Sequence, residues 1–397
     1  MPKHKPNLPE GAPLTTAAVE QHYTRPPSFT DLLPWMEYIP ESRAFLLEDG
    51  VSLGALFEVQ PVGCEARTPA FMTQLRDAIQ TAINEAIPER DDAPWVLQIY
   101  VQDEPRLTQF NESLARYPSP AVRASDYSQH YQSVMSKHLQ AISRPGGLFD
   151  DTTVTGSRWQ GQQRRIRVVL YRRLKNNGKA PPAVEVEEAL NDVATKWIAS
   201  LASAGINAQR ANGQAFYQWL LSWFNPNPPL AEGNPEALMQ LAPYPGDDHL
   251  PFGYDFAEQL TLSMPHSDEA TSSWIFDKLP HTVVTVQSLR RAPDIGHFTA
   301  ERQAGDQVYS LFDRLPEHTI MAITLTLKPQ DTTRNHIAQI KRAAVGDSAE
   351  ASITREDAEQ VEREMAQGNK LYPVSMAFYV RGDNQKALRN NLNRLHA

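Results

Sequence analysis

The 397-residue sequence contains a single cysteine, Cys64, which limits its covalent chemistry. One thiol cannot form an intramolecular disulfide, and a CxxC metal or redox site is excluded, so we expect a reducing compartment. No run approaches the roughly 18 apolar residues that a membrane span requires. The N-terminus, MPKHKPNLPEGAPL, lacks the apolar core of a secretory signal. These absences predict a cytosolic chain that reaches any membrane through a partner.

Motifs that hold phosphate or activate a nucleophile are also missing. The phosphate-binding pattern GxxxxGK[ST] does not occur, and Gly368-Asn369-Lys370 lacks both the upstream glycine and the following Ser or Thr. No GxSxG element of a hydrolase is present. The sequence therefore predicts no catalytic residue, no bound cofactor and no nucleotide hydrolysis by this chain alone.

Composition indicates a folded protein of more than one domain. Hydrophobic residues make up 41% of the chain and charged residues 21%, and the length suits two or three domains. The formal net charge of −9 at pH 7 disfavours nucleic acid as a partner of the whole surface. A local basic patch is still compatible with this charge.

Residues 45–59, FLLEDGVSLGALFEV, predict a β-hairpin that the rest of the chain covers. Asp49-Gly50 is a strong turn signal because both residues tolerate the positive φ angles of a tight primed turn. Apolar residues occupy every second position of the second run: Leu53, Ala55, Phe57 and Val59. One face of this strand must therefore face a core.

The remaining pattern predicts an α+β fold of two successive units, each a sheet with covering helices and split-βαβ, ferredoxin-like character. We expect a proline-rich flexible arm at 1–40, a first unit at 41–229 and a second at 230–397, truncated at its last helix. Thr68-Pro69 is typical of a helix start. Predicted strands include 95–101, 164–174, 206–208, 283–286, 319–327 and 371–380, with a hairpin from 256–262 and 274–276. Predicted helices include 121–142, 184–204, 296–312, 354–368 and the segment from 384 onward.

Arginine and lysine gather between Arg158 and Lys179, with no acidic residue among them. The basic residues are Arg158, Arg164, Arg165, Arg167, Arg172, Arg173, Lys175 and Lys179. Such a run suits phosphate or an acidic partner. The alternative, which we favour, is a strand margin whose charges pair with the nearby Glu185, Glu187 and Glu188. Few aromatic residues interleave with the run, which disfavours single-stranded DNA.

Two acidic groups and one aromatic group are weaker candidates. Asp103-Glu104 ends an apolar strand in the manner of a metal-holding pair, but without a phosphate loop we interpret it as a strand exit. Asp247-Asp248-His249 lacks the helical i, i+4 spacing of many metal sites, so we predict a turn and no metal. Aromatic residues at helical spacing predict core packing: Tyr217, Trp219, Trp223 and Phe224.

Three stretches resemble the N-terminal region of TraC-like (VirB-type) conjugative transfer ATPases of type IV secretion systems, particularly those of integrating conjugative elements. They are LLEDGVSLGALFE in the hairpin, YQWLLSWFNPNP at 217–228 and YPGDDHLPFGYDFAE at 244–258. The resemblance implies a motor-less assembly and docking domain, with ATP and Mg²⁺ bound only by a C-terminal domain outside this sequence. It also implies a cytoplasmic location, peripheral at the inner membrane.

The implied partners are inner-membrane components of the secretion channel and neighbouring copies of the ATPase. The predicted contact residues come from the hairpin and the basic run: Phe45, Leu47, Phe57, Arg164, Arg165, Arg172 and Arg173. The alternative function is a nucleic-acid-binding module that uses the run from Arg158 to Lys179. A hydrolase built on Asp103 and Glu104, or on the cluster from Asp247 to His249, ranks last, because no nucleophile or metal framework accompanies either group.

Overall fold

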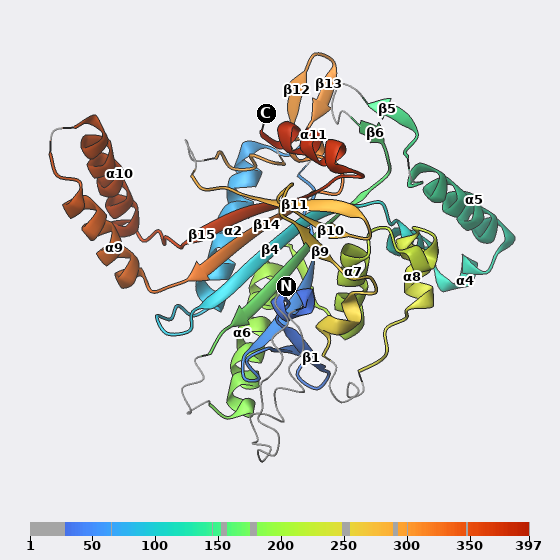
Figure 1. Ribbon diagram of the computed structural model, residues 1–397, viewed down its shortest axis with the longest axis horizontal. Coiled ribbons are helices and arrows are strands. Elements are labelled where there is room, and N and C mark those ends of the chain that lie inside the picture. Colours follow the sequence, from blue (N-terminus) through green and yellow to red (C-terminus); the bar gives the residue numbers. More distant parts are fainter. Residues whose placement is uncertain are drawn as a thin grey trace, which may run out of the picture.

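A computed structural model describes residues 28–64, 66–144, 146–151, 157–174, 181–247, 255–288, 293–299, 301–346 and 348–396. Its centre is one 11-stranded sheet with the order β1-β2-β3-β7-β4-β14-β15-β11-β10-β9, in which β8 also pairs with β3 (Figure 1). Every pairing in this sheet is antiparallel. The α+β class predicted from the sequence is confirmed, whereas its ferredoxin-like character stays a prediction.

The first half of the sheet is built around the predicted hairpin. Its strands are β1 (Trp35–Ile39), β2 (Ala44–Leu47), β3 (Leu53–Gln60), β4 (Trp95–Glu104), β7 (Gln163–Arg172) and β8 (Asn207–Arg210). Gly50 has a φ of 69°, and the Asp49 carboxylate accepts from the backbone N–H groups of Val51 and Ser52. The turn is longer than the two-residue form expected, because Leu47 N–H donates to the Ser52 carbonyl across four intervening residues.

Helices α2 (Pro69–Ala86) and α6 (Ala183–Ser203) pack on one face of this half. The predicted helix start is confirmed, since Thr68 Oγ1 accepts from the Phe71 N–H and Pro69 is the first helical residue. The core under the two helices contains Phe57, Trp95, Leu97 and Trp197. Burial of one such side chain contributes about 1.5–3 kcal/mol.

The opposite face is covered by α7 (Gly213–Phe224), followed by η2 (Pro229–Ala231) and α8 (Pro235–Leu241). Tyr217, Trp219 and Phe224 are buried there, which confirms the predicted core role of this aromatic group. Trp223 lies edge-on to Tyr379 of β15, with ring centroids 5.7 Å apart. The 3-10 helix η1 (Phe29–Leu32) adds Phe29 to the same cluster. Helix α7 therefore packs on strands from both halves of the chain.

The second half contributes β9 (His266–Asp268), β10 (Ser273–Phe276), β11 (Leu279–Thr285), β14 (Ile320–Leu327) and β15 (Val374–Arg381), with α11 (Gln385–His396) against the sheet. Two predictions were wrong here. The first is the hairpin from 256–262 and 274–276. Residues 257–260 form the 3-10 helix η3 (Ala257–Leu260), and the strand β10 at 273–276 pairs with β9 instead. The second wrong prediction is the helix at 296–312. Residues 302–309 instead form the hairpin β12 (Arg302–Ala304) and β13 (Gln307–Tyr309), followed by η4 (Phe312–Arg314), because Gly305-Asp306 is a two-residue hairpin turn.

The order of strands is a palindrome about the β4–β14 pair, in which Trp95 lies opposite Leu327 and Gln102 lies opposite Ile320. On each side of this pair, the first three strands of the half form the outer part of the sheet. A helical insertion lies between β4 and β7 in the first half and between β14 and β15 in the second. Each half also has a helix after the second of these strands, α6 and α11. The strands of 41–229 and 230–397 thus join in one sheet, and the division into two units stays a prediction.

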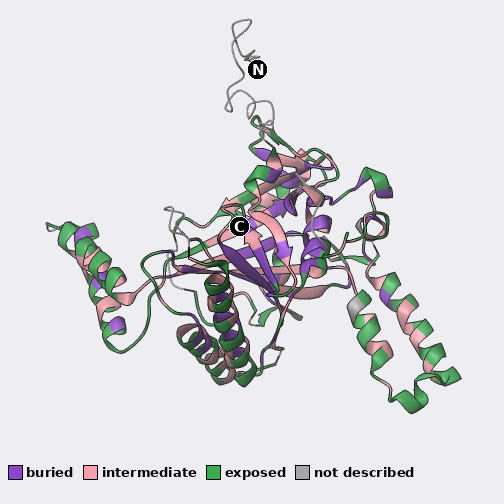
Figure 2. Ribbon diagram, turned by 90° about the horizontal axis from the view of Figure 1, so that it is seen from below, coloured by how far each residue is buried: buried purple, intermediate pink, exposed green. Residues whose placement is uncertain are grey.

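The two insertions are helical hairpins that project beyond opposite ends of the sheet (Figures 1 and 2). The first contains α3 (Thr108–Arg116), α4 (Pro120–Arg123) and α5 (Asp126–Ile142), between β4 and β7. It is followed by the small hairpin β5 (Phe149–Asp151) and β6 (Ser157–Trp159). The second contains α9 (Gln330–Ala343) and α10 (Ala349–Ala366), between β14 and β15. The predicted arm is described only from residue 28, where η1 and β1 form; residues 1–27 lie outside the described residues.

Candidate functional site

The basic run predicted from the sequence lies on β7, where it meets carboxylates of the neighbouring strand β4. The antiparallel register places Arg164 directly opposite Asp103. The guanidinium donates twice to the Asp103 carboxylate, at 3.0 Å each, and once to Asp313 at 3.1 Å. Burial opposes the charge of Arg164, but these bonds outweigh it and raise its pKa. Arg164 is therefore already occupied by two carboxylates.

Glu104 pairs with Arg167, the most deeply buried arginine of the run. Its carboxylate accepts from Arg167 Nη1 at 2.7 Å, and both residues are nearly fully buried. Arg106 and Arg165 approach the same carboxylate at 3.4 and 4.0 Å. Burial alone raises the pKa of Glu104, yet the attraction of Arg167 and Arg106 outweighs it and holds this pKa below its ordinary value. The Arg167 guanidinium also lies 4.9 Å from the centroid of the Trp219 ring.

The other arginines of the run pair outside the predicted partners. Arg173 pairs with Glu48 of the β2–β3 turn, Arg158 with Asp150, and Arg172 donates to the Ala93 carbonyl at 2.7 Å. The expectation that Glu185, Glu187 and Glu188 neutralise the run was wrong for these described arginines, since their partners come from the β2–β3 turn, strand β5 and the segment before β4. Lys175 and Lys179 lie outside the described residues.

Asp103-Glu104 ends β4, in agreement with the strand exit that the sequence predicted. Both carboxylates are engaged by arginines rather than turned toward an open cavity. The sequence pattern did not predict that these two carboxylates pair with the arginines of the basic run. Antiparallel pairing of 95–104 with 163–172 was the signal that could have joined them, because opposite charges at facing positions attract.

The three hairpin residues predicted to contact a partner lie in the core. Phe45, Leu47 and Phe57 are at most 1% exposed. The Phe45 ring packs 4.5 Å from that of Phe216, and the Phe57 ring 5.0 Å from that of Trp197, both centroid to centroid. Their apolar surface is used internally in this structure, and a contact role for these side chains stays a prediction.

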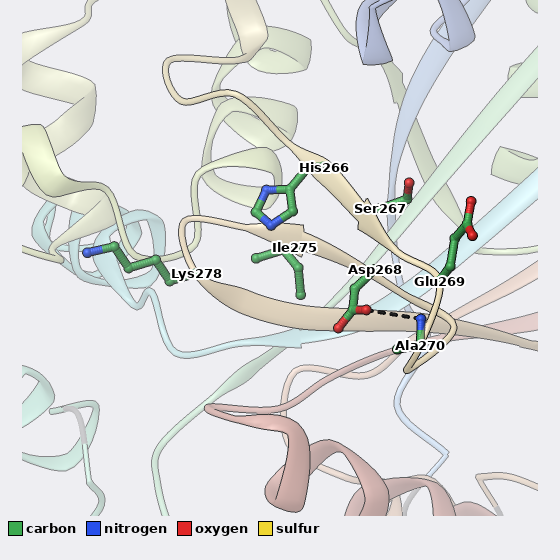
Figure 3. Close-up of a pocket in the computed structure, with 7 residues that line it drawn as sticks. All are labelled: His266, Ser267, Asp268, Glu269, Ala270, Ile275 and Lys278. Carbon is green, nitrogen blue, oxygen red and sulfur yellow. Dashed lines mark hydrogen bonds between the residues drawn. The ribbon is translucent and has the colours of Figure 1, made fainter. Parts of the chain in front are cut away.

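A shallow depression of about 650 Å³ lies at the β9–β10 end of the sheet (Figure 3). Its lining includes His266, Asp268, Glu269 and Lys278. Asp268 is committed to its own turn, since it accepts from the Ala270 N–H at 3.1 Å and from the Thr271 hydroxyl at 2.7 Å. Among the described residues no group of three or more His, Cys, Asp or Glu is arranged to hold a metal ion. The depression therefore combines charged side chains with the apolar surface of residues such as Ile275.

A second depression, of about 470 Å³, has Tyr38, Arg43, Glu58 and Asp247 in its wall. Asp247 accepts a hydrogen bond from the Tyr244 hydroxyl at 2.7 Å. Burial, followed by this bond, raises the pKa of Tyr244. Asp248 and His249, the other members of the sequence-predicted cluster, lie outside the described residues.

Comparison with known families gives a match to the family described as TraC protein, over residues 29–397. The chain belongs to the TraC family. The match covers the whole central sheet, so this TraC-family fold includes both halves of the palindrome. Membership supports a role in conjugative transfer by type IV secretion. No curated protein matches the chain. In the part of the TraC-family chain that the structure describes, no helix is both long and apolar enough to cross a membrane.

Proposed function

We propose that this chain is the assembly and docking part of a conjugative transfer ATPase, of the kind carried by integrating conjugative elements. It links the motor of that ATPase to inner-membrane components of the secretion channel and to neighbouring subunits. It works on the cytoplasmic side, peripheral to the inner membrane. ATP and Mg²⁺ bind only to a separate C-terminal motor domain, and this chain holds no cofactor of its own.

One observation carries the proposal: the family match spans residues 29–397, yet the sequence has no GxxxxGK[ST]. A phosphate loop supplies the backbone N–H groups and the lysine that hold a triphosphate. A chain without that loop contributes to a transfer ATPase through its surfaces. The wide sheet and two projecting helical hairpins provide such surfaces.

Charge pairing supports this proposal over the nucleic-acid-binding alternative. Phosphate binding draws its free energy from the release of counterions by cationic side chains. Arg164 and Arg167 are held by Asp103 and Glu104, so a phosphate would have to displace a carboxylate already in place. The basic run therefore stabilises the pairing of β4 with β7 rather than binding a polyanion.

The test is pairwise co-purification. The chain is co-expressed, one at a time, with each integral inner-membrane protein encoded by the same transfer system, and the detergent-solubilised complex is isolated through a tag on the chain. We expect at least one component to be retained, with no ATP turnover by the purified chain. Retention of none, or turnover that co-elutes with the chain and survives repeated purification, would overturn the proposal.

A further inference from the structure

The two projecting helical hairpins occupy equivalent places in the palindromic sheet. The α3–α5 hairpin joins β4 to β7, and the α9–α10 hairpin joins β14 to β15. Because β4 and β14 run antiparallel, the hairpins leave the sheet at opposite ends. Figure 2 shows that both stand clear of the body and are largely exposed. Each copy therefore carries two separate, outward-facing helical surfaces.

Helix α5 presents an apolar stripe that nothing in the described chain covers. Tyr127, Tyr131 and Val134 follow one another at i, i+4 and i+7, which places them on one helical face. Their exposed fractions are 81%, 44% and 50%. The opposite side of α5 packs on α3, where Gln132 Nε2 donates to the Asn111 side chain at 2.8 Å. An amphipathic helix whose apolar stripe faces solvent is typical of a docking surface.

Helix α10 presents a face of different character. Glu350, Ile353 and Asp357 share one side of the helix, at i, i+3 and i+7. All three are exposed, Ile353 to 57%, and Val345 is 81% exposed at the tip of the hairpin. The inner side of α10 packs on α9 through Ala351, Ala358 and Met365. This face therefore combines apolar side chains with acidic ones.

The two faces are complementary in charge. Arg116, Arg123 and Lys137 are exposed on the α3–α5 hairpin and outnumber its exposed carboxylates, Glu112 and Asp126, although Arg116 pairs with Glu112 at 3.2 Å. The exposed acidic residues of α10 that do not pair with α9 include Glu350, Glu356 and Asp357. An apolar centre with a rim of opposite charges is the usual composition of a specific protein interface. Since the surfaces lie at opposite ends of one chain, they can meet only between copies.

We propose that the α3–α5 hairpin of one copy binds the α9–α10 hairpin of the next, head to tail. This inference rests on the proposed assembly function and assigns the surface through which neighbouring subunits meet. A heterologous contact of this kind closes into a ring if the rotation between copies allows it, and otherwise extends into a filament. The apolar stripe of α5 lies against Ile353 and Val345, and the charges surround it.

The test is the association state of the full 397-residue chain, measured by sedimentation velocity across the micromolar range. We expect the wild-type chain to associate with rising concentration. The double variant Tyr127→Glu/Tyr131→Glu and the double variant Glu350→Lys/Asp357→Lys should each stay monomeric, with association weakened at least tenfold. The control Met264→Glu changes a side chain that is 91% exposed and lies outside both hairpins, and it should associate like the wild type.

Mixing the two double variants tests the head-to-tail arrangement directly. Each keeps one intact surface, so an equimolar mixture should form heterodimers and nothing larger. The inference is overturned if the wild type stays monomeric, if either variant associates like the wild type, or if the mixture does not pair. Circular dichroism melting identifies a misfolded variant. Retention of an inner-membrane component by the monomeric variants reports on the docking function separately, so failure of one proposal is distinguishable from failure of the other.

Discussion

The two halves of the sheet share a strand order but differ in what covers them. In the first half, α6 buries five residues, Leu190, Val193, Ala194, Trp197 and Leu201, and α2 packs beside it. In the second half α11 buries one, Leu388, and a short hairpin with a 3-10 helix follows β11 in place of a crossover helix. We therefore expect the two halves to differ in stability despite their equivalent topology, because stability follows the apolar area removed from water.

The largest difference in stability between the two halves should come from truncating a buried core side chain in each. We expect Phe57→Ala, in the first half, to lower the free energy of unfolding by about 3–5 kcal/mol, because its fully buried ring leaves a cavity beside Trp197. Phe378→Ala should lower it less, because Phe378 belongs to a smaller core cluster of the second half, with Phe312, Met321, Val380 and Leu388. Urea unfolding followed by tryptophan fluorescence measures both. Equal losses would show that the two halves are equally well packed.

The next largest effect on stability should come from breaking the buried ion pair between Glu104 of β4 and Arg167 of β7. Glu104→Ala leaves Arg167 buried without its closest carboxylate, so we expect a loss of about 3 kcal/mol in the free energy of unfolding. The matched control is Asp150→Ala, which removes an exposed partner of Arg158 and should change stability by less than about 1 kcal/mol. Similar small effects for both variants would contradict a structural role for the Glu104 charge.

Lowering the pH should destabilise the second half of the sheet through protonation of His281 in β11. Burial lowers its pKa from 6.5 to about 4, with a smaller contribution from Arg381 across the strand pair. Between these values the unfolded chain binds a proton that the folded chain does not, so this stability is present above pH 6.5 and is lost as the pH falls toward 4. The loss should amount to about 3 kcal/mol.

The measurement is the free energy of unfolding against pH for the wild type and for His281→Gln. The variant should show a flatter dependence between pH 6.5 and 4, since it cannot take up this proton. Hydrogen exchange at pH 5 should then rise in β11 before it rises in β3. An unchanged slope in the variant would assign the acid sensitivity to other groups.

The smallest effect should be on DNA binding. Because Arg164 and Arg165 lie against the carboxylates of β4, we expect weak binding to single- and double-stranded DNA, with a salt dependence of about one phosphate contact or fewer. The double variant Arg164→Ala/Arg165→Ala should leave that slope unchanged. A slope equivalent to several contacts, lost in the double variant, would favour the nucleic-acid-binding function instead.

Local patterns predicted much of this fold. Apolar runs at 95–101, 164–174 and 319–327 became β4, β7 and β14, and Thr68-Pro69 began α2. The predicted helix at 296–312 failed because its apolar spacing competed with the turn at Gly305-Asp306. The candidate site was predicted less well. The basic run was found, but its partners were not, since ion pairs between strands depend on register.

The sequence by itself determined the α+β class, the hairpin at 45–59, the aromatic core helix and the absence of a phosphate loop, because composition and short-range spacing specify these features. Only the tertiary structure decided that β4 and β14 join both halves in one sheet. It also decided that Phe45 and Phe57 face inward and that Asp103 and Glu104 neutralise the arginines of β7. The physical reason is distance along the chain: strand pairing, burial and charge pairing here connect residues tens to hundreds of positions apart.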